Sequence, residues 1–349
     1  MINISPHISR GAQRRTLISV LAVTLAASMI GLATQAASAH TVQTGYGWPV
    51  KPFDRTHPVR GSFGDPRTVF KAAPTMDGLM HGSGGFSFHF GIDISAPDGT
   101  DVYPVVSGTV VQVTREWVAV DTGGGRSFQY WHIHALVRSG EHVDAGRTVL
   151  GTILPGAQHI HLSELEDGRA VNPLQPGHLT PYADRTKPVV EAISFRAGET
   201  GPELMTNFVR GRITMIAEAY DRPELRVPGE WAGMPVAPAL ITWRIQGLGG
   251  KVVVPETVAV DFRSTIPSNG AFWSYYARGT YQNMSVFGKH FSYREPGCFL
   301  FKLTRTAFDT RQLKDGVYDL VVTATDIRGN HDSESLRFTV HNRPGWVGS

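Results

Sequence analysis

The sequence predicts an all-β protein, in which an antiparallel β-sheet domain is followed by an immunoglobulin-like β-sandwich. Between about 45 and 180, short runs rich in branched and aromatic residues alternate with glycine turns such as GGG at 123–125, a pattern typical of β-hairpins. Beyond about 185, apolar and polar residues alternate along the chain, as in half-buried strands. No segment has the spacing of a long amphipathic helix.

The first 39 residues have the composition of a secretory signal peptide. A segment with three arginines precedes an apolar run at 17–33, and the small residues Ala-Ser-Ala end at Ala39. The alternative is a retained membrane anchor, because seventeen apolar residues approach the length that spans a bilayer. We expect cleavage near Ala39 and a bacterial protein that is secreted or associated with the cell envelope, without stable membrane insertion.

Charge and cysteine content narrow the possible partners. The chain has 33 basic and 30 acidic residues, and removing the three arginines of the signal leaves thirty of each. A neutral mature chain does not indicate nucleic acid as a partner. The single cysteine, Cys298, excludes an internal disulfide, so packing and a possible metal must stabilise the fold. The sequence does not predict an oligomeric state.

About 310 residues remain after the signal, which is more than one core usually serves and therefore suggests two domains. The seam is expected where proline and polar residues cluster, in LTPYADRTKPVVEAISF. The expected parts are a signal peptide at 1–39, an N-terminal linker at 40–60, a first β domain at 61–180 and a β-sandwich accessory domain at 185–343.

Ionisable residues with regular spacing lie in the apolar runs of the first domain. His89 and Asp93 are four apart, YWHIH at 130–134 holds His132 and His134, and HIH at 159–161 holds His159 and His161. Charged or polar groups among apolar neighbours require a partner or a metal. Residues two apart on a strand share a face, so His159 and His161 are expected side by side, and His89 and Asp93 can share a face if their segment is extended.

Two imidazoles and one carboxylate, as in the set His89, Asp93 and His161, can bind one zinc ion and leave a fourth tetrahedral position open, as in catalytic sites. Such a site makes a water acidic enough to attack a carbonyl at neutral pH. His132 and His159 would then be free to exchange protons and to donate hydrogen bonds to a developing oxyanion. A lone histidine on a strand is more often structural, but this ordered set favours a metal centre.

The sequence resembles the lysostaphin and LytM-type zinc endopeptidases, which cleave peptidoglycan peptides. The resemblance covers about residues 60–180, and the matching segments are SFGDPR (62–67), HFGIDISAPDGTDVYPVVSGTVV (89–111), YWHIHALVRSGEHVDAGRTVLG (130–151) and HIHLSELEDGRAVNPLQ (159–175). It implies a zinc metallopeptidase domain at 61–180 with His89, Asp93 and His161 as metal ligands. It also assigns His132 and His159 to catalysis, a division within HIH that the spacing alone does not determine.

Three departures from the family pattern concern the cleft. His134 stands where a small polar residue is usual, and we expect it to point the same way as His132 and to be structural or to face substrate. The segment between Arg67 and His89 is long and contains His81, so it is a candidate wall or cover of the cleft. The segment TILPGAQ stands directly before His159, where the family usually has a segment rich in glycine and threonine.

The second domain is expected to contain the strands ALITWRIQG, GVYDLVVTATD and SLRFTV, in each of which every second residue is apolar. The aromatic segment 272–301 is expected to be mostly core; the alternative is that its exposed rings contact a glycan or the first domain. Four polar residues near strand ends are expected to be solvated and not to bind calcium: Asp221, Asp326, Asn330 and Asp332.

These features together predict a secreted zinc metalloendopeptidase that holds one zinc ion per chain and hydrolyses peptidoglycan cross-links or stem peptides by a zinc-activated water. One alternative is a non-catalytic envelope module of the same fold that binds or activates a wall hydrolase. Another is an extracellular peptidase that acts on proteins. The complete set of expected ligands favours the enzyme, whereas the cleaved bond depends on loops that the sequence does not determine.

Overall fold

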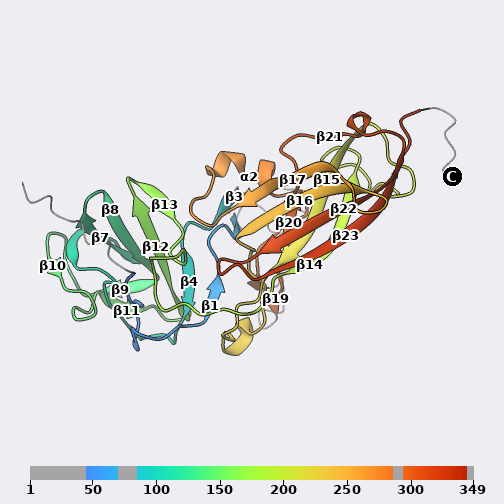
Figure 1. The fold of residues 1–349 in the computed structure, drawn as a ribbon. Helices are drawn as coiled ribbons and strands as arrows, with labels where there is room; N and C mark the ends of the chain where they lie inside the picture. The colour runs from blue at the N-terminus through green and yellow to red at the C-terminus, as the bar shows by residue number, and fades with distance from the viewer. Residues whose placement is uncertain (1–44, 70–84, 286–293, 344–349) are drawn as a thin grey trace, which may run out of the picture. The chain divides into compact units, whose positions relative to one another are not determined.

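The computed structural model describes residues 45–69, 85–285 and 294–343. The expected signal peptide, 1–39, and His81 lie outside these residues. The chain from Gln43 to Ser349 forms one compact unit. Both expected domains fall inside this unit, so the boundary between them stays a prediction. Almost all regular structure in the described part is antiparallel strand, which confirms the all-β class (Figure 1).

One large antiparallel sheet dominates the first part of the chain. In spatial order its strands are β1 (Val59–Gly61), β4 (Ile92–Ser95), β12 (His159–Glu166), β8 (Arg126–Trp131), β7 (Trp117–Gly123), β6 (Gly108–Val113) and β10 (His142–Val143), with β13 (Arg169–Val171) beside β12. Two smaller sheets contain β5 (Asp101–Val102), β11 (Gly151–Ile153) and β9 (Ile133–Ala135), and β2 (Pro66–Val69) and β3 (Gly85–Phe88). These sheets confirm the hairpin pattern read from the sequence.

Strand β12 is central, since it pairs with β4 on one side and with β8 on the other. Its residues from His159 to Glu164 are all buried, whichever face of the sheet they point to. Polar side chains buried in this way need partners within the protein. The partners of His159 and His161 therefore belong to neighbouring elements.

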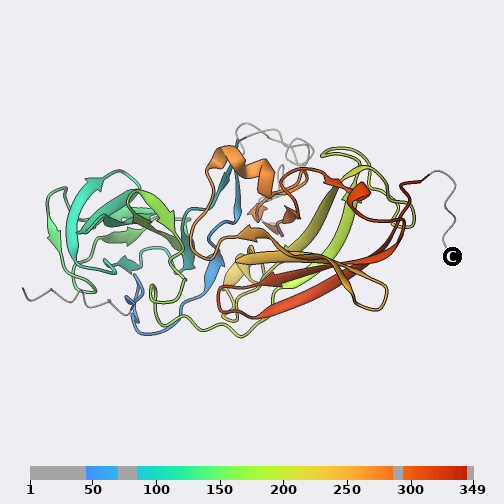
Figure 2. The ribbon, with the colours of Figure 1, turned by 45° about the horizontal axis from the view of Figure 1, so that its top comes forward.

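The second part of the chain contains two facing antiparallel sheets. One has β14 (Val189–Arg196), β15 (Arg212–Tyr220) and β20 (Leu300–Lys302), with β21 (Phe308–Asp309) beside β15. The other has β17 (Val252–Asp261), β16 (Leu240–Gly247), β22 (Gly316–Thr325) and β23 (His331–Val340). Strand β14 packs against β22 and β23, which makes a β-sandwich as expected (Figure 2). A separate pair contains β18 (Met284–Ser285) and β19 (Arg294–Glu295).

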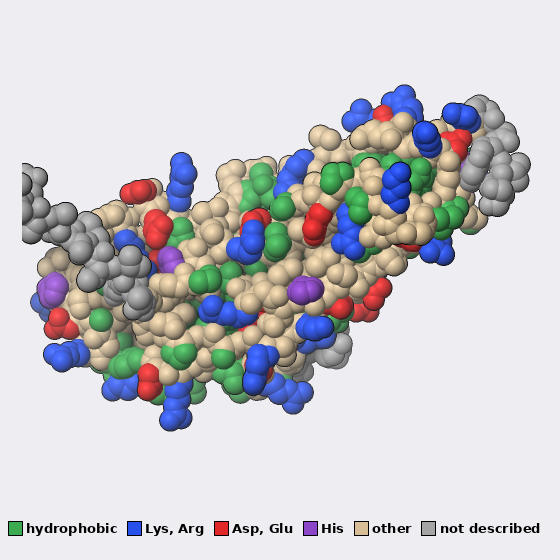
Figure 3. Space-filling model, viewed as in Figure 1, with side chains coloured by type: hydrophobic (Ala, Val, Ile, Leu, Met, Phe, Trp, Pro, Cys, Tyr) green, Lys and Arg blue, Asp and Glu red, His purple; other side chains and the backbone are tan. Residues whose placement is uncertain are grey.

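The helical elements in the described residues are short. They are α2 (Phe272–Tyr275) and the 3₁₀ turns η2 (Gly229–Trp231), η3 (Asn269–Ala271) and η4 (Thr310–Gln312). No helix of the described part is long and apolar enough to cross a membrane. On the face in Figure 3, basic and acidic side chains are interspersed, in keeping with the balanced charge of the chain.

The alternating pattern predicted for the sandwich agrees with the burial. Along β22 the side chains of Leu320, Val322 and Ala324 are buried, and on β16 those of Ile241 and Trp243 are. The described rings of segment 272–301 are mostly core, as expected, with Phe272, Tyr276, Phe299 and Phe301 all buried.

Two expectations about polar residues of this part are wrong. Asp221 and Asp326 are 5% and 2% exposed, not solvated. They lie with Asp184 at strand ends and loops, where backbone N–H groups of Arg222 and Arg328 donate to their carboxylates. Burial raises the pKa of both Asp221 and Asp326. The sequence did not indicate that these two aspartates are buried, because each directly follows a strand, as turn residues usually do. Only the packing of the surrounding chain excludes water from them.

Direct hydrogen bonds join the two parts of the unit. The backbone N–H of Ala237 donates to the Asp65 carboxylate at 2.7 Å, and the Tyr276 hydroxyl donates to the Gly64 carbonyl at 2.7 Å. Gly64 has φ +89, and a Cβ there would lie 2.3 Å from the Phe262 ring, so glycine is required for this close approach. These contacts fix the loop that leads from β1 to β2.

In the described part of the expected linker 40–60, from residue 45 on, Tyr46 and Trp48 are buried in the interior. Trp48 is 1% exposed, and its indole N–H donates to the Pro181 carbonyl at 2.7 Å. The Tyr46 hydroxyl donates to Glu164 Oε2 at 2.5 Å. Glu164 is fully buried on β12 and also binds Arg126 and His178 through their side chains.

Because Glu164 is the acceptor for three buried or half-buried donors, we expect Glu164→Ala to lower the free energy of unfolding by about 3–5 kcal/mol. Urea denaturation followed by fluorescence measures the change. The matched control is Glu166→Ala, two residues along the same strand at an exposed position, which is expected to change stability by less than about 0.5 kcal/mol. Equal effects of the two substitutions would contradict the assigned role of Glu164.

Candidate metal centre

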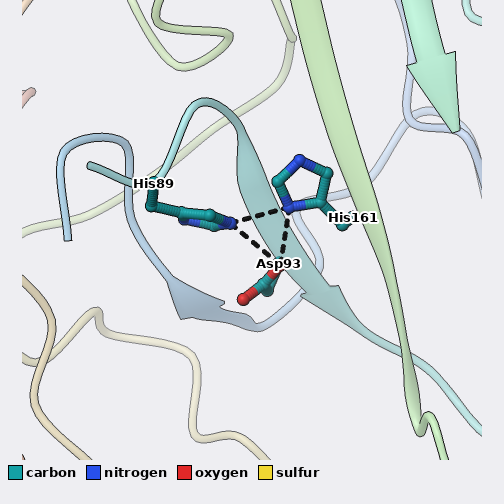
Figure 4. A group of neighbouring side chains, drawn as sticks. All are labelled: His89, Asp93 and His161. Atoms are coloured by element: carbon teal, nitrogen blue, oxygen red, sulfur yellow. Dashed lines mark hydrogen bonds and ion pairs between the residues drawn. The ribbon is translucent and has the colours of Figure 1, made fainter. Parts of the chain in front are cut away.

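Three side chains expected as ligands meet at the junction of β3, β4 and β12. His89 follows the last residue of β3, Asp93 lies on β4, and His161 lies on β12 directly opposite Asp93 in the strand register. The three side chains point toward one another (Figure 4). His89 and Asp93 do not share one continuous strand as considered from the sequence, because the chain bends at Gly91.

Gly91 makes this arrangement possible. A Cβ at this position would lie 2.4 Å from the Leu162 carbonyl and 2.8 Å from His161 Nε2, closer than such atoms approach one another. The bend at Gly91 therefore places the chain directly against β12, beside His161.

The ligand atoms form a small triangle. His89 Nε2 lies 2.7 Å from His161 Nδ1, and Asp93 Oδ1 lies 3.1 Å from each of these nitrogens. All three residues are buried. In a tetrahedral zinc site with bonds of about 2.0–2.1 Å, ligand atoms are roughly 3.3–3.4 Å apart, so the triangle needs to open by only a few tenths of an ångström.

In each of the two histidines of the triangle, the hydrogen bond made by the outer ring nitrogen determines which nitrogen carries the proton. His89 Nδ1 lies 2.8 Å from the Ser62 carbonyl oxygen, which can only accept, so Nδ1 carries the proton. His161 Nε2 lies 2.7 Å from the Ser163 hydroxyl, which can accept its proton. The lone pairs of His89 Nε2 and His161 Nδ1 are then directed at the triangle, as metal ligands require. The residues present fit a metal ion.

Asp93 is held in its ionised form. Burial alone raises the pKa of its carboxyl, but the neighbouring imidazoles and the Arg67 guanidinium hold that pKa well below its usual range. Arg67 Nη2 donates to Asp93 Oδ2 at 2.6 Å, which leaves Oδ1 for the metal. A Cβ at Gly61 would lie 2.5 Å from Asp93 Oδ2 and 2.6 Å from Arg67 Nη2, so glycine is needed beside this pair.

His132 and His159 lie beside the triangle without being part of it. Their ring centroids are 4.5 Å apart, and His159 Nε2 is 3.5 Å from Asp93 Oδ1. Burial lowers the pKa of His132, and it lowers the pKa of His159 to about 3. Both rings are therefore neutral at pH 7 and can accept or donate a proton.

The backbone of His132 is unusual, since its φ is +66. Left-handed backbone at a non-glycine residue costs free energy and occurs preferentially at functional sites. Here the backbone N–H of His132 donates to the Glu116 carbonyl at 2.7 Å, and its carbonyl accepts from Leu154 N–H at 2.9 Å. These bonds hold the strained residue between β8 and β9, with its ring beside His159.

A cavity of about 400 Å³ lies over the triangle. Its wall includes the five expected site residues and also Arg60, Phe90, Trp131 and Trp231. Phe90 stands near the metal ligands, with its ring centroid 4.8 Å from that of His161. The cavity thus offers apolar surface and cations next to the two neutral imidazoles.

Arg60 and Trp231 were not expected at the site, and Arg67 was expected only as part of a matching segment, without a role of its own. Arg67 stands in the motif SFGDPR, which is a detectable signal, whereas neither Arg60 nor Trp231 lies in a recognised pattern. His134 lies on β9, exposed, and is not part of the cavity wall. Its position does not support contact with a substrate in this cavity.

Among the residues that the structure describes, two other groups of acidic and histidine residues have potential ligand atoms within 4.8 Å of one another. In the group of Glu164, Glu166 and His178, Glu164 already accepts from Arg126, Tyr46 and His178. The group of Asp184, Asp221 and Asp326 offers only carboxylate oxygens as possible ligands. Several of these oxygens already accept hydrogen bonds from backbone N–H groups. The second group contains no histidine, and neither group lines the cavity over the triangle.

Two ring nitrogens and one carboxylate oxygen, open to a cavity with two further histidines, are a donor set typical of hydrolytic metal centres. Comparison with protein families agrees with this class. Residues 87–173 match the model of peptidase family M23. The match includes all five expected site residues and confirms the resemblance to LytM-type peptidases for this part of the chain.

Solved structures also resemble part of the chain. A chain of the SpoIIQ–SpoIIIAH pore-forming complex has 22% identity and a TM-score of 0.30, with 38% of this chain and 90% of that chain covered. A zinc-containing peptidase from Vibrio cholerae has 21% identity and a TM-score of 0.29, with 37% and 39% covered. The catalytic domain of the prophage-encoded M23 protein EnpA from Enterococcus faecalis has 25% identity and a TM-score of 0.22, with 24% and 75% covered.

These TM-scores are all below 0.5, so the structural likenesses carry no argument about function. A search of curated proteins finds no match. The family match and the geometry of the site are therefore the basis for the function.

Proposed function

We propose that the protein is a secreted zinc-dependent endopeptidase that hydrolyses peptide bonds of peptidoglycan, in its cross-links or stem peptides. The observation that carries this proposal is the triangle of His89, Asp93 and His161 at the wall of a cavity that also contains His132 and His159. The match to peptidase family M23 supports peptide hydrolysis, and the resemblance to LytM-type enzymes supports peptidoglycan as the substrate.

Export and domain organisation are part of the same proposal. The apolar run at 17–33 and the small residues ending at Ala39 support a cleaved signal peptide. The domain at 61–180 would carry the metal centre. The β-sandwich at 185–343 would be an accessory domain on the same exported chain.

His89, Asp93 and His161 would hold one zinc ion, which when bound supplies a Lewis acid that polarises a carbonyl and increases the acidity of water. The rings of His132 and His159 lie beside the ligands and are neutral, so they can take a proton from the attacking water and return it to the leaving amine. Arg67 holds the Asp93 carboxylate in one orientation. Phe90 and Trp131 add apolar surface to the cavity wall beside these rings. No residue forms a covalent bond with the substrate.

The test combines metal analysis with an assay on cell walls. Purified mature chain is expected to contain one zinc per chain and to release soluble muropeptides from peptidoglycan. Chelation is expected to abolish release, and added zinc to restore it. Zinc without release from any cell wall tried would contradict the substrate, and absence of zinc after expression with adequate metal would contradict the whole proposal.

A further inference from the structure

Trp231 belongs to the second part of the chain, yet its ring lies at the metal cavity. It is the last residue of η2, and it lines the same cavity as His132 and His159. Its indole lies against the side chain of Arg60 on β1, with the guanidinium carbon 4.6 Å from the ring centroid. This distance is within the range of a cation–π contact.

Arg60 in turn contacts a residue of the proposed catalytic machinery. Arg60 Nη2 lies 2.7 Å from His159 Nδ1. A guanidinium remains protonated at any ordinary pH and has no acceptor atom. For this contact to be a hydrogen bond, Nδ1 must accept with its lone pair. The proton of the neutral ring is then on Nε2, the nitrogen that faces Asp93 and the metal triangle.

A second partner of Nδ1 favours the opposite tautomer. The Ala157 carbonyl oxygen lies 2.6 Å from the same nitrogen and could accept a proton from it. One ring nitrogen cannot both donate to Ala157 and accept from Arg60. The Arg60 contact thus favours Nε2–H in neutral His159, and the Ala157 contact favours Nδ1–H.

We propose that Trp231 is a positioning residue for the proposed hydrolysis, because it holds the Arg60 guanidinium on His159 Nδ1 and thereby keeps the proton on His159 Nε2. In this tautomer His159 donates a hydrogen bond into the cavity, to the carbonyl oxygen as negative charge develops on it. His132, whose ring is 4.5 Å away by centroids, is then the group that accepts the proton of the attacking water. The inference rests on the proposed function.

The strength of a cation–π contact sets the expected size of the effect. A tenfold change in an equilibrium corresponds to about 1.4 kcal/mol, which is within the range of a cation–π contact. Without the indole, the Arg60 side chain can adopt other rotamers. The tautomer in which His159 Nδ1 donates to the Ala157 carbonyl then becomes more populated. The fraction of His159 in the donating tautomer should fall, and kcat should fall with it by about tenfold.

The test uses the full mature chain, loaded with zinc, with histidine labelled by ¹⁵N. The side-chain ¹⁵N signals of His159, assigned by their loss in His159→Gln, report which ring nitrogen carries the proton. Wild type is expected to show a protonated Nε2 and an unprotonated Nδ1. In Trp231→Ala the Nδ1 signal should move toward the protonated position, and kcat should fall about tenfold with KM nearly unchanged. Trp231→Phe, which keeps an aromatic face, should restore most of both.

The matched control is Phe208→Ala. Phe208 is half exposed in the second part of the chain, lies under the Arg210 guanidinium at 5.5 Å and does not line the cavity. The Phe208→Ala substitution should leave the His159 signals and kcat unchanged.

The proposal is overturned if wild-type His159 carries its proton on Nδ1, or if Trp231→Ala leaves the His159 signals unmoved. A rise in KM alone would also overturn it, since Trp231 would then contact the substrate. The NMR measurement needs no substrate, so it tests Trp231 even if the chain hydrolyses no peptidoglycan. Failure of the proposed function is thus distinguishable from failure of this inference.

Discussion

Replacement of His161 by alanine is expected to remove zinc from the protein and to abolish its peptidase activity. The proposed ligand set consists of three side chains, in which His161 Nδ1 lies 2.7 Å from His89 Nε2 and 3.1 Å from Asp93 Oδ1. With His161 gone, only one imidazole and one carboxylate remain. We expect zinc affinity to fall by more than about 100-fold, because loss of even an outer partner of a ligand costs 10–100-fold.

Zinc stoichiometry after dialysis against a metal-buffered solution measures this effect, together with muropeptide release. Asp93→Ala should behave in the same way, since it removes the single oxygen ligand. The matched control is His134→Ala, which removes an exposed histidine of the same part of the chain and should leave zinc content and release unchanged. Full zinc occupancy in His161→Ala or Asp93→Ala contradicts the ligand assignment.

Replacement of His132 by alanine is expected to leave zinc in place and to lower kcat by about 10²–10⁴-fold. The ring lies beside His159 but is not one of the three atoms of the triangle. Burial lowers the pKa of His132, so it is neutral at pH 7 and able to accept a proton. Loss of a positioned acid–base group typically costs a factor of this size.

The measurement is turnover of a muropeptide substrate by zinc-loaded protein, with metal content determined on the same sample. His159→Ala should also keep the metal and reduce kcat, because His159 is the other neutral ring in the cavity. Since His132 has a strained backbone, the circular dichroism spectrum and the melting temperature of each variant must match wild type before rates are compared. Unchanged turnover in His132→Ala removes this residue from the mechanism.

The fold class could be read from local patterns. Alternation along GVYDLVVTATD predicts which side chains of β22 face the core, and Leu320, Val322 and Ala324 are buried as expected. A strand reverses the direction of its side chains at every residue, so the sequence itself carries this information. The same rule places His159 and His161 on one face of β12, although it says nothing of what lies opposite them.

The candidate ligands were also recognisable, but their geometry was not. The spacing of His89 and Asp93 suggested a shared strand face, whereas the structure brings them together through a bend at Gly91 and through pairing of β4 with β12. The tautomers of His89 and His161 depend on Ser62 and Ser163. Of these, only Ser163 follows from local spacing, as the next residue but one after His161 on the same strand.

The sequence by itself determined the all-β class and the histidine and aspartate residues that can bind a metal, because both depend on residue type and short-range periodicity. Only the tertiary structure decided which side chains surround them. Arg60 reaches His159 across 99 residues, and Trp231 reaches Arg60 from the second part of the chain. Such contacts depend on how distant strands and loops pack, and packing is a property of the whole fold that no local pattern encodes.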